Sequence, residues 1–318
     1  MMVRALTYSL FTSVILVLGC NDKAGTPVAV RLNPDQVSAA TALDEVDRFV
    51  ALGPRVPGSP GAERAANYLL KRLKDLGLDA RMDVFEEETP TGSTTFRNVV
   101  ATSSGSAKRT VVLVSHYDTK GGISEDFVGA NDSGSSTGLL LAMAPMLKDG
   151  MGDALRVILL FVDGEECQHR YSENDGLHGS RYAAQQFKQG DDSDDIVGVI
   201  VVDMIGDRDL NVSIPRNGTS SLISLAFASA ESEGVRRTFS LFRSAIIDDH
   251  VPFLEAGFPA IDLIDFHFGS KPGKNDYWHT DDDTMDKLSG ESLETVGRVV
   301  IRMLNALAVE RKKQGAVE

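Results

Sequence analysis

The chain has 318 residues with 42% hydrophobic and 25% charged residues, a composition that excludes collagen, coiled coils, disulfide scaffolds and disordered tails. Its formal net charge is −14, from 46 Asp and Glu residues against 32 Lys and Arg residues. Such an acidic surface repels phosphate backbones and anionic lipid headgroups, so we expect no nucleic-acid partner. A chain of this length can bury a large core without a metal, so any metal would serve function.

The N-terminus has the pattern of an export signal. Arg4 precedes an apolar stretch at residues 10–18, which is too short to span a bilayer comfortably, and Gly19 and Cys20 follow. A small residue before cysteine is similar to the bacterial lipobox, which predicts an exported lipoprotein whose only membrane contact is a lipid on Cys20. The alternative is a plain signal peptide with an incidental cysteine, and therefore a secreted protein.

These features predict three segments. Residues 1–19 are the signal peptide, residues 20–33 are a tether, and residues 34–318 form a single catalytic domain. If Cys20 is acylated, Cys167 has no partner, so no internal disulfide is expected.

The first part of the domain shows helix and hairpin punctuation. Pro34 and Asp35 open a helical pattern that runs to Val50 and ends at Gly53, and Ser59 before Pro60 begins a second helix that ends at Gly77. Strand-like runs at residues 80–85 and 95–101 flank the turn-rich residues 89–93, which is typical of a hairpin.

The rest of the chain repeats strand, loop and helix. Four runs that are apolar on both faces are expected to form central strands, at residues 110–114, 155–162, 196–202 and 260–264. The closing segment, residues 289–311, has the amphipathic spacing of a final helix. The pattern predicts an α/β protein, a three-layer αβα sandwich with a mostly parallel central sheet.

Carboxylates and histidines follow the apolar runs, where the chemistry of open α/β sheets sits. They are His116, Asp118, Asp163, Glu165, Glu166, Asp203, Asp248, Asp249 and His250, with Asp132 and His279 on loops between them. Carboxylates held together repel one another, and burying them is costly unless a cation offsets the charge. Imidazole and carboxylate ligands without cysteine suit zinc, so the pattern predicts a zinc site. Glu165 and Glu166 are neighbours that point in different directions, so one can bind metal while the other moves protons.

From about Gly53 to Leu307, these residues resemble the zinc-dependent aminopeptidase and glutaminyl cyclase superfamily. The resemblance implies a central eight-stranded mixed sheet. It also implies zinc ligands at Asp132, Glu166 and His279, a general base and acid at Glu165, and second-metal positions at His116 and Asp203.

The segments beside those residues favour the cyclase branch. The resemblance lies in residues 116–120, 127–130, 248–254 and 278–280. Typical aminopeptidases have Ser where Asp248 stands, and in cyclases that acid joins a catalytic proton network together with the equivalents of Glu165 and Asp203. Trp278 and Tyr171 are expected to enclose the substrate side chain.

The sequence also departs from the animal cyclases. Tyr171 replaces a wall Trp, Asp262 replaces His, and Ser115 replaces one cysteine of a disulfide near the zinc. The loop at residues 266–276 is longer than in the animal cyclases. It borders the predicted substrate pocket, so the substrate specificity of those enzymes does not carry over.

Three functions follow from this interpretation. The first is a glutaminyl-peptide cyclotransferase with one zinc, acting on peptide or protein N-termini. The second is an aminopeptidase in which Glu165 activates water between two zinc ions. The third is a non-catalytic binding lipoprotein, against which the complete set of ligands and the base argue. Oligomeric state is not predicted.

Overall fold

This computed structural model describes residues 30–191 and 193–309. The predicted signal peptide at residues 1–19, the predicted lipidation site Cys20 and residues 21–29 of the predicted tether lie outside the described residues. None of the helices within the described ranges combines the length and the apolar character needed to cross a bilayer.

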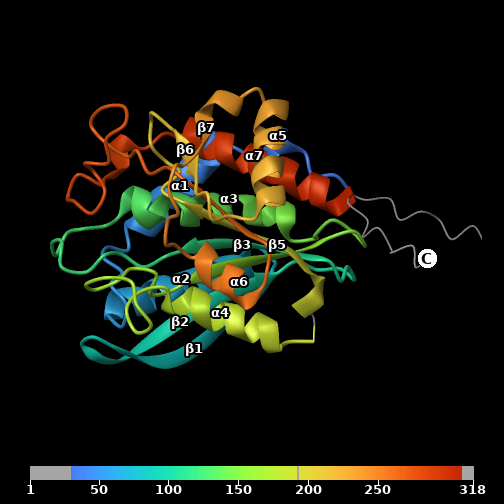
Figure 1. The fold of residues 1–318 in the computed structure, drawn as a ribbon. Coiled ribbons are helices and arrows are strands. Elements are labelled where there is room, and N and C mark those ends of the chain that lie inside the picture. Colours follow the sequence, from blue (N-terminus) through green and yellow to red (C-terminus); the bar gives the residue numbers. More distant parts are fainter. Residues whose placement is uncertain (1–29, 192, 310–318) are drawn as a thin grey trace, which may run out of the picture.

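The predicted α/β sandwich is confirmed, and its centre is a mixed sheet of six strands (Figure 1). The sheet order is β1-β2-β4-β3-β5-β8. The strands are β1 (Asp79–Thr89), β2 (Gly92–Thr102), β3 (Thr110–His116), β4 (Arg156–Val162), β5 (Ile196–Asp203) and β8 (Ala260–Ile264). β1, β2 and β4 pair antiparallel, whereas β4, β3, β5 and β8 pair parallel.

The expectation of eight strands in one sheet is wrong for the described residues. β6 (Val212–Ile214) and β7 (Phe239–Leu241) form a separate parallel pair. Each has only three residues, and β6 forms its backbone bonds with β7, so β8 stays at the edge of the main sheet. Thr219 bonds both backbone groups of Ala260 at the start of β8: its amide N–H donates to the Ala260 carbonyl, and its hydroxyl oxygen accepts the Ala260 amide N–H.

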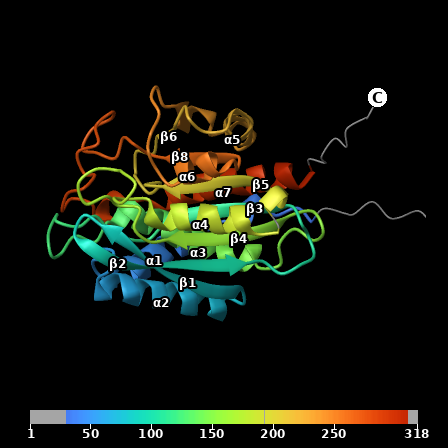
Figure 2. The same cartoon turned by 60° about the horizontal axis from the view of Figure 1, so that its bottom comes forward.

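Helices cover both faces of the sheet (Figures 1 and 2). Two of them, α4 (His178–Gln189) and α6 (His250–Ala256), lie side by side on one face. The opposite face and the β1–β2 edge carry α1 (Ala39–Val50), α2 (Pro60–Asp75), α3 (Ser136–Leu147), α5 (Ser220–Ser232) and α7 (Gly290–Val309). The central strands are apolar on both sides because they feed two separate cores: Val111 and Leu113 pack into one, Val112 and Val114 into the other.

Local chemistry explains where the first helices begin. Ser59 accepts the amide N–H of Ala62 and caps α2, whose first residue is Pro60, as predicted. α1 begins later than predicted, because Pro34–Gln36 forms a 3₁₀ turn and Ser38 then caps the α-helix. Leu32 exchanges two hydrogen bonds with the Asn305 side chain on α7, so the two ends of the described chain lie together.

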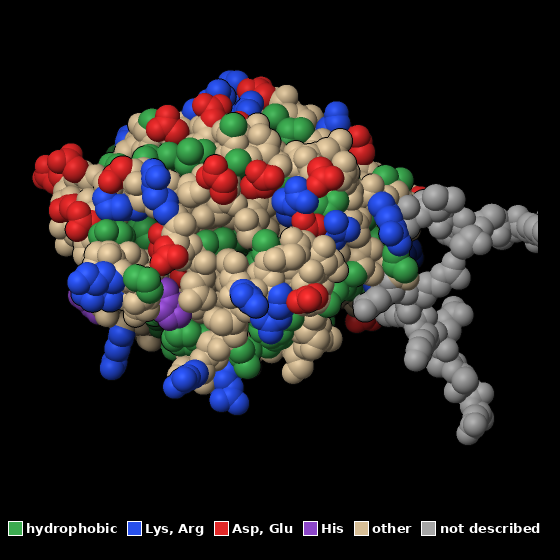
Figure 3. All heavy atoms as spheres, turned by 90° about the horizontal axis from the view of Figure 1, so that it is seen from above, with side chains coloured by type: hydrophobic (Ala, Val, Ile, Leu, Met, Phe, Trp, Pro, Cys, Tyr) green, Lys and Arg blue, Asp and Glu red, His purple; other side chains and the backbone are tan. Residues whose placement is uncertain are grey.

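The parallel strands direct their carboxyl ends to one edge of the sheet. The loops that follow β3, β4 and β8 protrude together at the left in Figure 1, away from the two described ends of the chain. The face seen from above, over α5 and α7, carries interspersed acidic and basic side chains, so the negative charge of the chain is not gathered there (Figure 3). Because ligands bind outside the carboxyl ends of parallel strands, a site is expected among the loops that follow β3, β4 and β8.

Candidate metal centre and active site

Asp132 lies at the centre of two groups of ligand atoms. Its Oδ2 is 3.2 Å from Nε2 of His279, which is also 2.9 Å from Oε1 of Glu166. Its Oδ1 is 3.1 Å from Nε2 of His116, which is also 3.3 Å from Oδ1 of Asp203. The structure thus brings the five predicted ligand residues together as two metal-competent groups that share Asp132.

The chemistry of these groups fits a divalent cation such as zinc. Asp132, Glu166, Asp203 and His116 are buried, and Oε2 of Glu166 has no hydrogen-bond partner in the described protein. Burial lowers the pKa of His279, but Asp132 and Glu166 outweigh it and raise that pKa to about 9. Without a metal, protonated imidazoles must offset the carboxylates, and a bound cation would take over that role.

Glu165 turns away from the ligands toward Tyr171. The Tyr171 hydroxyl donates to Oε1 of Glu165 at 2.6 Å. Burial is the main cause that raises the pKa of Glu165 well above its usual value, and the neighbouring charges of Glu166 and Asp248 raise it further. The paired glutamates therefore do point in different directions, and Glu165 is a candidate general base because it is buried, lines the cavity and has a raised pKa.

Asp248 adds a second buried acid beside Glu165. Burial and the charge of Asp203 raise the pKa of Asp248 well above its usual value, and burial also raises the pKa of Asp203. These carboxyl groups cannot all ionise together in a buried site, so protons are shared among them.

These residues line one cavity of about 340 Å³ whose walls are mainly apolar. The Trp278 ring stacks on the His279 imidazole with centroids 4.0 Å apart, and it also contacts Phe266 at 5.3 Å. Residues 246–247, the short apolar pair before Asp248, form part of a loop, so Asp248 does not follow a strand as the other acids do, and Ile247 is 54% exposed at the cavity. The cavity is lined by Asp132, Glu165, Glu166, Tyr171, Asp203, Met204, Phe242, Ala245, Ile246, Ile247, Asp248, Ile264, Phe266, Trp278 and His279.

Two aspartates that the sequence analysis did not assign hold the site in place. Asp118 accepts the amide N–H groups of Glu165 and Glu166, both at 3.2 Å, and its Oδ1 lies 3.4 Å from Nδ1 of His116. Asp283 accepts the amide N–H of Asp132 at 3.1 Å. Their only sequence signal is proximity, since Asp118 follows His116 by two residues and Asp283 follows His279 by four.

Gly129 sets the approach of the chain to Asp132. Its φ is +51°, and a Cβ at this position would come within 2.0 Å of the Asp132 carbonyl oxygen. Only glycine fits such a turn. Glycine is therefore required at position 129 for the chain to place Asp132, the residue shared by both ligand groups.

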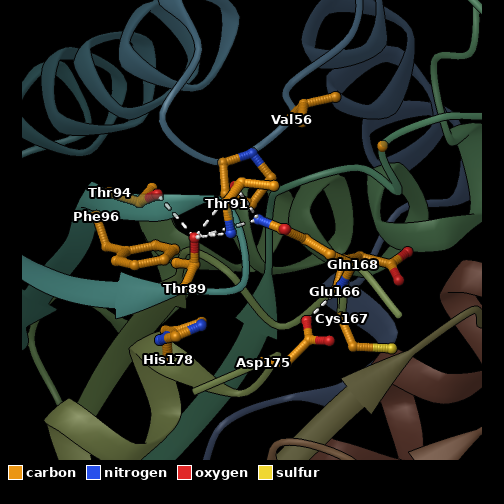
Figure 4. A pocket seen from close by; sticks show the side chains of 12 residues that line it. Val56, Thr89, Thr91, Thr94, Phe96, Glu166, Cys167, Gln168, Asp175 and His178 are labelled. Atoms are coloured by element: carbon orange, nitrogen blue, oxygen red, sulfur yellow. Dashed lines mark hydrogen bonds between the residues drawn. The ribbon is translucent and has the colours of Figure 1, made fainter. Parts of the chain in front are cut away.

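A second cavity of about 360 Å³ is lined by the tip of the β1–β2 hairpin and by residues 166–168 of the loop that carries the glutamates (Figure 4). It contains Glu166 but not the other proposed ligands, so the chemistry belongs to the first cavity. Here Gln168 bonds Thr91 at the tip of the β1–β2 hairpin, at 3.0 Å, which anchors the loop. Nζ of Lys120 lies 3.5 Å from the sulfur of Cys167, which places a basic group from the loop after β3 beside this buried thiol.

Two predicted departures have a clear local structure. Ser115, which stands at a cysteine position, bonds the Ser136 hydroxyl at 2.8 Å and the Thr137 hydroxyl at 3.1 Å, so hydrogen bonds join β3 to α3. The loop at residues 266–276 is held internally by Asp276, which accepts from the backbone and hydroxyl of Ser270.

Comparison with known proteins agrees with this geometry. The family described as Peptidase family M28 matches residues 98–304. Glutaminyl-peptide cyclotransferase of Bos taurus is 29% identical, over 83% of this chain and 82% of its own length. The crystal structure of an Acidobacteriales bacterium glutaminyl cyclase is 31% identical with a TM-score of 0.80, covering 90% of this chain and 98% of that one. Glutaminyl cyclase of Porphyromonas gingivalis is 28% identical with a TM-score of 0.74, covering 86% and 99%.

Proposed function

The chain belongs to peptidase family M28, on its glutaminyl cyclase branch, and we propose that it converts the N-terminal Gln of peptides to pyroglutamate with release of ammonia. One observation carries the proposal. A buried base, Glu165, and a second buried acid, Asp248, face the same small cavity as the ligand group around Asp132. A single base that can take a proton and return it is what an intramolecular amide exchange requires.

Asp132, Glu166 and His279 are the residues that would hold the catalytic zinc. When bound there, zinc supplies a Lewis acid for the side-chain carbonyl of the substrate glutamine. Nζ of Lys120 lies 3.5 Å from Oε2 of Glu166, so its charge offsets part of the charge of that carboxylate without a hydrogen bond.

Glu165 moves the proton in the proposed reaction. The substrate α-amine attacks the δ-carbon of its own side-chain amide, and Glu165 accepts the proton that the amine loses. The C–N bond to the side-chain nitrogen then breaks, and Glu165 returns the proton so that ammonia leaves. Burial raises the pKa of Asp248 well above its usual value, which favours the neutral carboxyl, and in the proposed reaction this carboxyl hydrogen-bonds the departing nitrogen.

The cavity walls orient the substrate and exclude water. Trp278 and Tyr171 flank the position of the short glutamine side chain, and the Tyr171 hydroxyl keeps Glu165 aimed into the cavity. Excluding water favours attack by the tethered amine over hydrolysis.

The second group, His116, Asp132 and Asp203, supports one alternative. If it holds a second zinc, Glu165 could activate water and the enzyme would be an aminopeptidase. We prefer the cyclase because Asp248 lies on the same cavity as Glu165. Hydrolysis between two metal ions does not need this second acid, whereas the cyclase reaction uses it to bind the departing nitrogen.

The test uses zinc-loaded protein and two peptides that differ only in their first residue, Gln or Leu. We expect the Gln peptide to lose one ammonia by mass spectrometry, and the Leu peptide to remain intact. Chelation of zinc should abolish the reaction, and zinc should restore it. Glu165→Gln should abolish it too, whereas Glu173→Gln, an exposed position in the same loop, should not change it.

The other outcomes decide among the alternatives. Release of the first residue from either peptide would establish an aminopeptidase, and metal analysis should then find two zinc ions per chain. An Nα-acetylated Gln peptide must not react, because its nitrogen cannot attack. If neither free peptide changes, the cyclase proposal fails and a binding role remains.

A further inference from the structure

A fully buried histidine and aspartate, which the proposed mechanism does not use, lie behind Asp248. His250 and Asp262 are 0% exposed, and Nδ1 of His250 is 3.9 Å from Oδ2 of Asp262. Neither oxygen of Asp262 has a hydrogen-bond partner within the part of the chain that the structure describes, and neither has Nδ1 of His250. Buried polar atoms left in this way call for an explanation.

Asn217 fixes which ring nitrogen of His250 carries the proton. The Asn217 oxygen accepts the amide N–H of Ile246 at 3.2 Å, and its nitrogen donates to the Ile246 carbonyl at 2.9 Å, so the amide cannot be flipped without losing both bonds. The same nitrogen lies 2.9 Å from Nε2 of His250. An amide nitrogen only donates, so Nε2 must accept and the proton is on Nδ1.

The proton on Nδ1 therefore faces Asp262. Burial lowers the pKa of His250 to about 4, which agrees with a neutral ring. This N–H and the carboxyl of Asp248 are two groups within reach of Asp262, since ligand atoms of all three side chains lie within 4.8 Å of one another. Asp248 in turn lines the cavity beside Glu165.

We propose that Asn217, His250 and Asp262 form a positioning chain that holds the Asp248 carboxyl toward the reacting groups. Asn217 sets the tautomer, His250 donates from Nδ1 to Asp262, and Asp262 shares a hydrogen bond with Asp248. The 3.9 Å separation between Nδ1 of His250 and Oδ2 of Asp262 is longer than a hydrogen bond, so the proposal requires this contact to tighten in the substrate complex, as catalytic hydrogen bonds commonly do. The inference rests on the proposed function, because it assigns these residues to the same reaction.

The Asn217 clamp argues against a metal at this triad. A metal at Asp248, His250 and Asp262 would need the lone pair of Nδ1, and the proton would then have to sit on Nε2. Two N–H groups would face each other at 2.9 Å, which is repulsive. Hydrogen bonding is therefore the role that the local geometry favours.

The first experiment reads the tautomer directly and needs no activity. In protein with ¹⁵N-labelled histidine, the His250 resonances, identified by their loss in His250→Gln, should show a neutral ring protonated on Nδ1 from about pH 6 to about pH 8. Asn217→Asp, which only accepts, should move the proton to Nε2. The control is Asn305→Asp, since Asn305 clamps Leu32 with the same two bonds far from the cavity and should leave His250 unchanged. A wild-type ring protonated on Nε2 overturns the proposal.

The second experiment separates positioning from mere packing. Asp262→Leu, similar in size but unable to bond, should lower kcat about tenfold or more with KM changed less than about twofold, because Asp248 loses its orientation. Asp262→Asn can still accept from His250 and donate to Asp248, so it should keep kcat within about threefold of wild type. An unchanged kcat in Asp262→Leu, or a lower zinc content in that variant, contradicts the proposal. If wild-type protein does not cyclise Gln peptides, the proposed function fails. The His250 spectrum still tests whether Asn217, His250 and Asp262 are linked by the proposed hydrogen bonds.

Discussion

At the scale of single residues, the contact between Tyr171 and Glu165 controls the proposed base. The phenol donates to the carboxylate at 2.6 Å and so stabilises its charged form, against burial that favours the neutral form. Tyr171→Phe removes the donor, so the pKa of Glu165 rises further. The base is then deprotonated only at higher pH, and kcat/KM should fall about tenfold at neutral pH.

The measurement is a profile of kcat/KM against pH for wild type and Tyr171→Phe. The acidic limb should move to higher pH in the variant, and the loss should be smaller at high pH than at low pH. Tyr182→Phe is the matched control, because Tyr182 stacks on Phe85 away from the cavity. A limb that stays in place would show that Tyr171 only fills space.

Residues with chemistry in their side chains were easier to predict than the residues that hold them. Glu165 and Glu166 stand directly after an apolar strand, so the sequence alone placed them at the sheet edge. Asp118 and Asp283 act by accepting backbone N–H groups, and nothing in a sequence indicates which amides a carboxylate will meet. Asp262 lies inside a strand, where a buried acid has no periodic pattern to reveal its partner.

At the scale of elements, a single arginine joins three segments around the metal centre. Arg55, between α1 and α2, is fully buried. It donates to the carbonyl of Tyr117 at 2.7 Å and to the carbonyls of Val128 and Gly129 at 2.8 and 3.2 Å. It therefore ties the start and the end of the loop that leads from β3 to Asp132. Burial lowers its pKa to about 10, so it still carries its charge at neutral pH.

Arg55→Lys should loosen this loop. The ammonium keeps the charge but cannot replace the planar fork, so several buried carbonyls lose their donor. We expect the free energy of unfolding to fall by about 2–4 kcal/mol in urea denaturation, and zinc affinity to fall with it. Arg64→Lys, on the exposed face of α2, should change neither quantity by a measurable amount. Equal stability of Arg55→Lys and wild type would contradict this role.

The elements themselves show how far the sequence pattern reaches. β8 has the bounds that its apolar run predicted, because a strand buried on both faces is apolar throughout. β6 and β7 were missed, since three residues are too few to show a period. α1 begins later than predicted, because Pro34 fits a 3₁₀ turn as well as a helix start.

At the scale of the whole molecule, the structure buries several acids, among them Asp163 and Asp265, whose pKa values burial raises. Burial and the charge of Asp118 raise the pKa of Asp163 to about 8, and Oδ1 of Asp163 has no hydrogen-bond partner in the described protein. Burial also raises the pKa of Asp265 to about 7. An Asp in the unfolded chain has a pKa of about 3.9, so the folded protein binds more protons between these values. The stability that these groups contribute is complete below about pH 4 and is lost as the pH rises through about 7 to 8.

The metal-free protein should therefore become less stable as the pH rises from about 5 to about 9, with a Tm lower by several degrees at the upper end. Asp163→Asn is neutral at every pH and its amide oxygen can still accept the Arg97 amide N–H, so its Tm should fall less steeply over the same range. Exposed Asp126→Asn should keep the wild-type slope. Calorimetry on chelator-treated protein measures all three slopes, and parallel curves for wild type and Asp163→Asn would show that Asp163 does not titrate in this range.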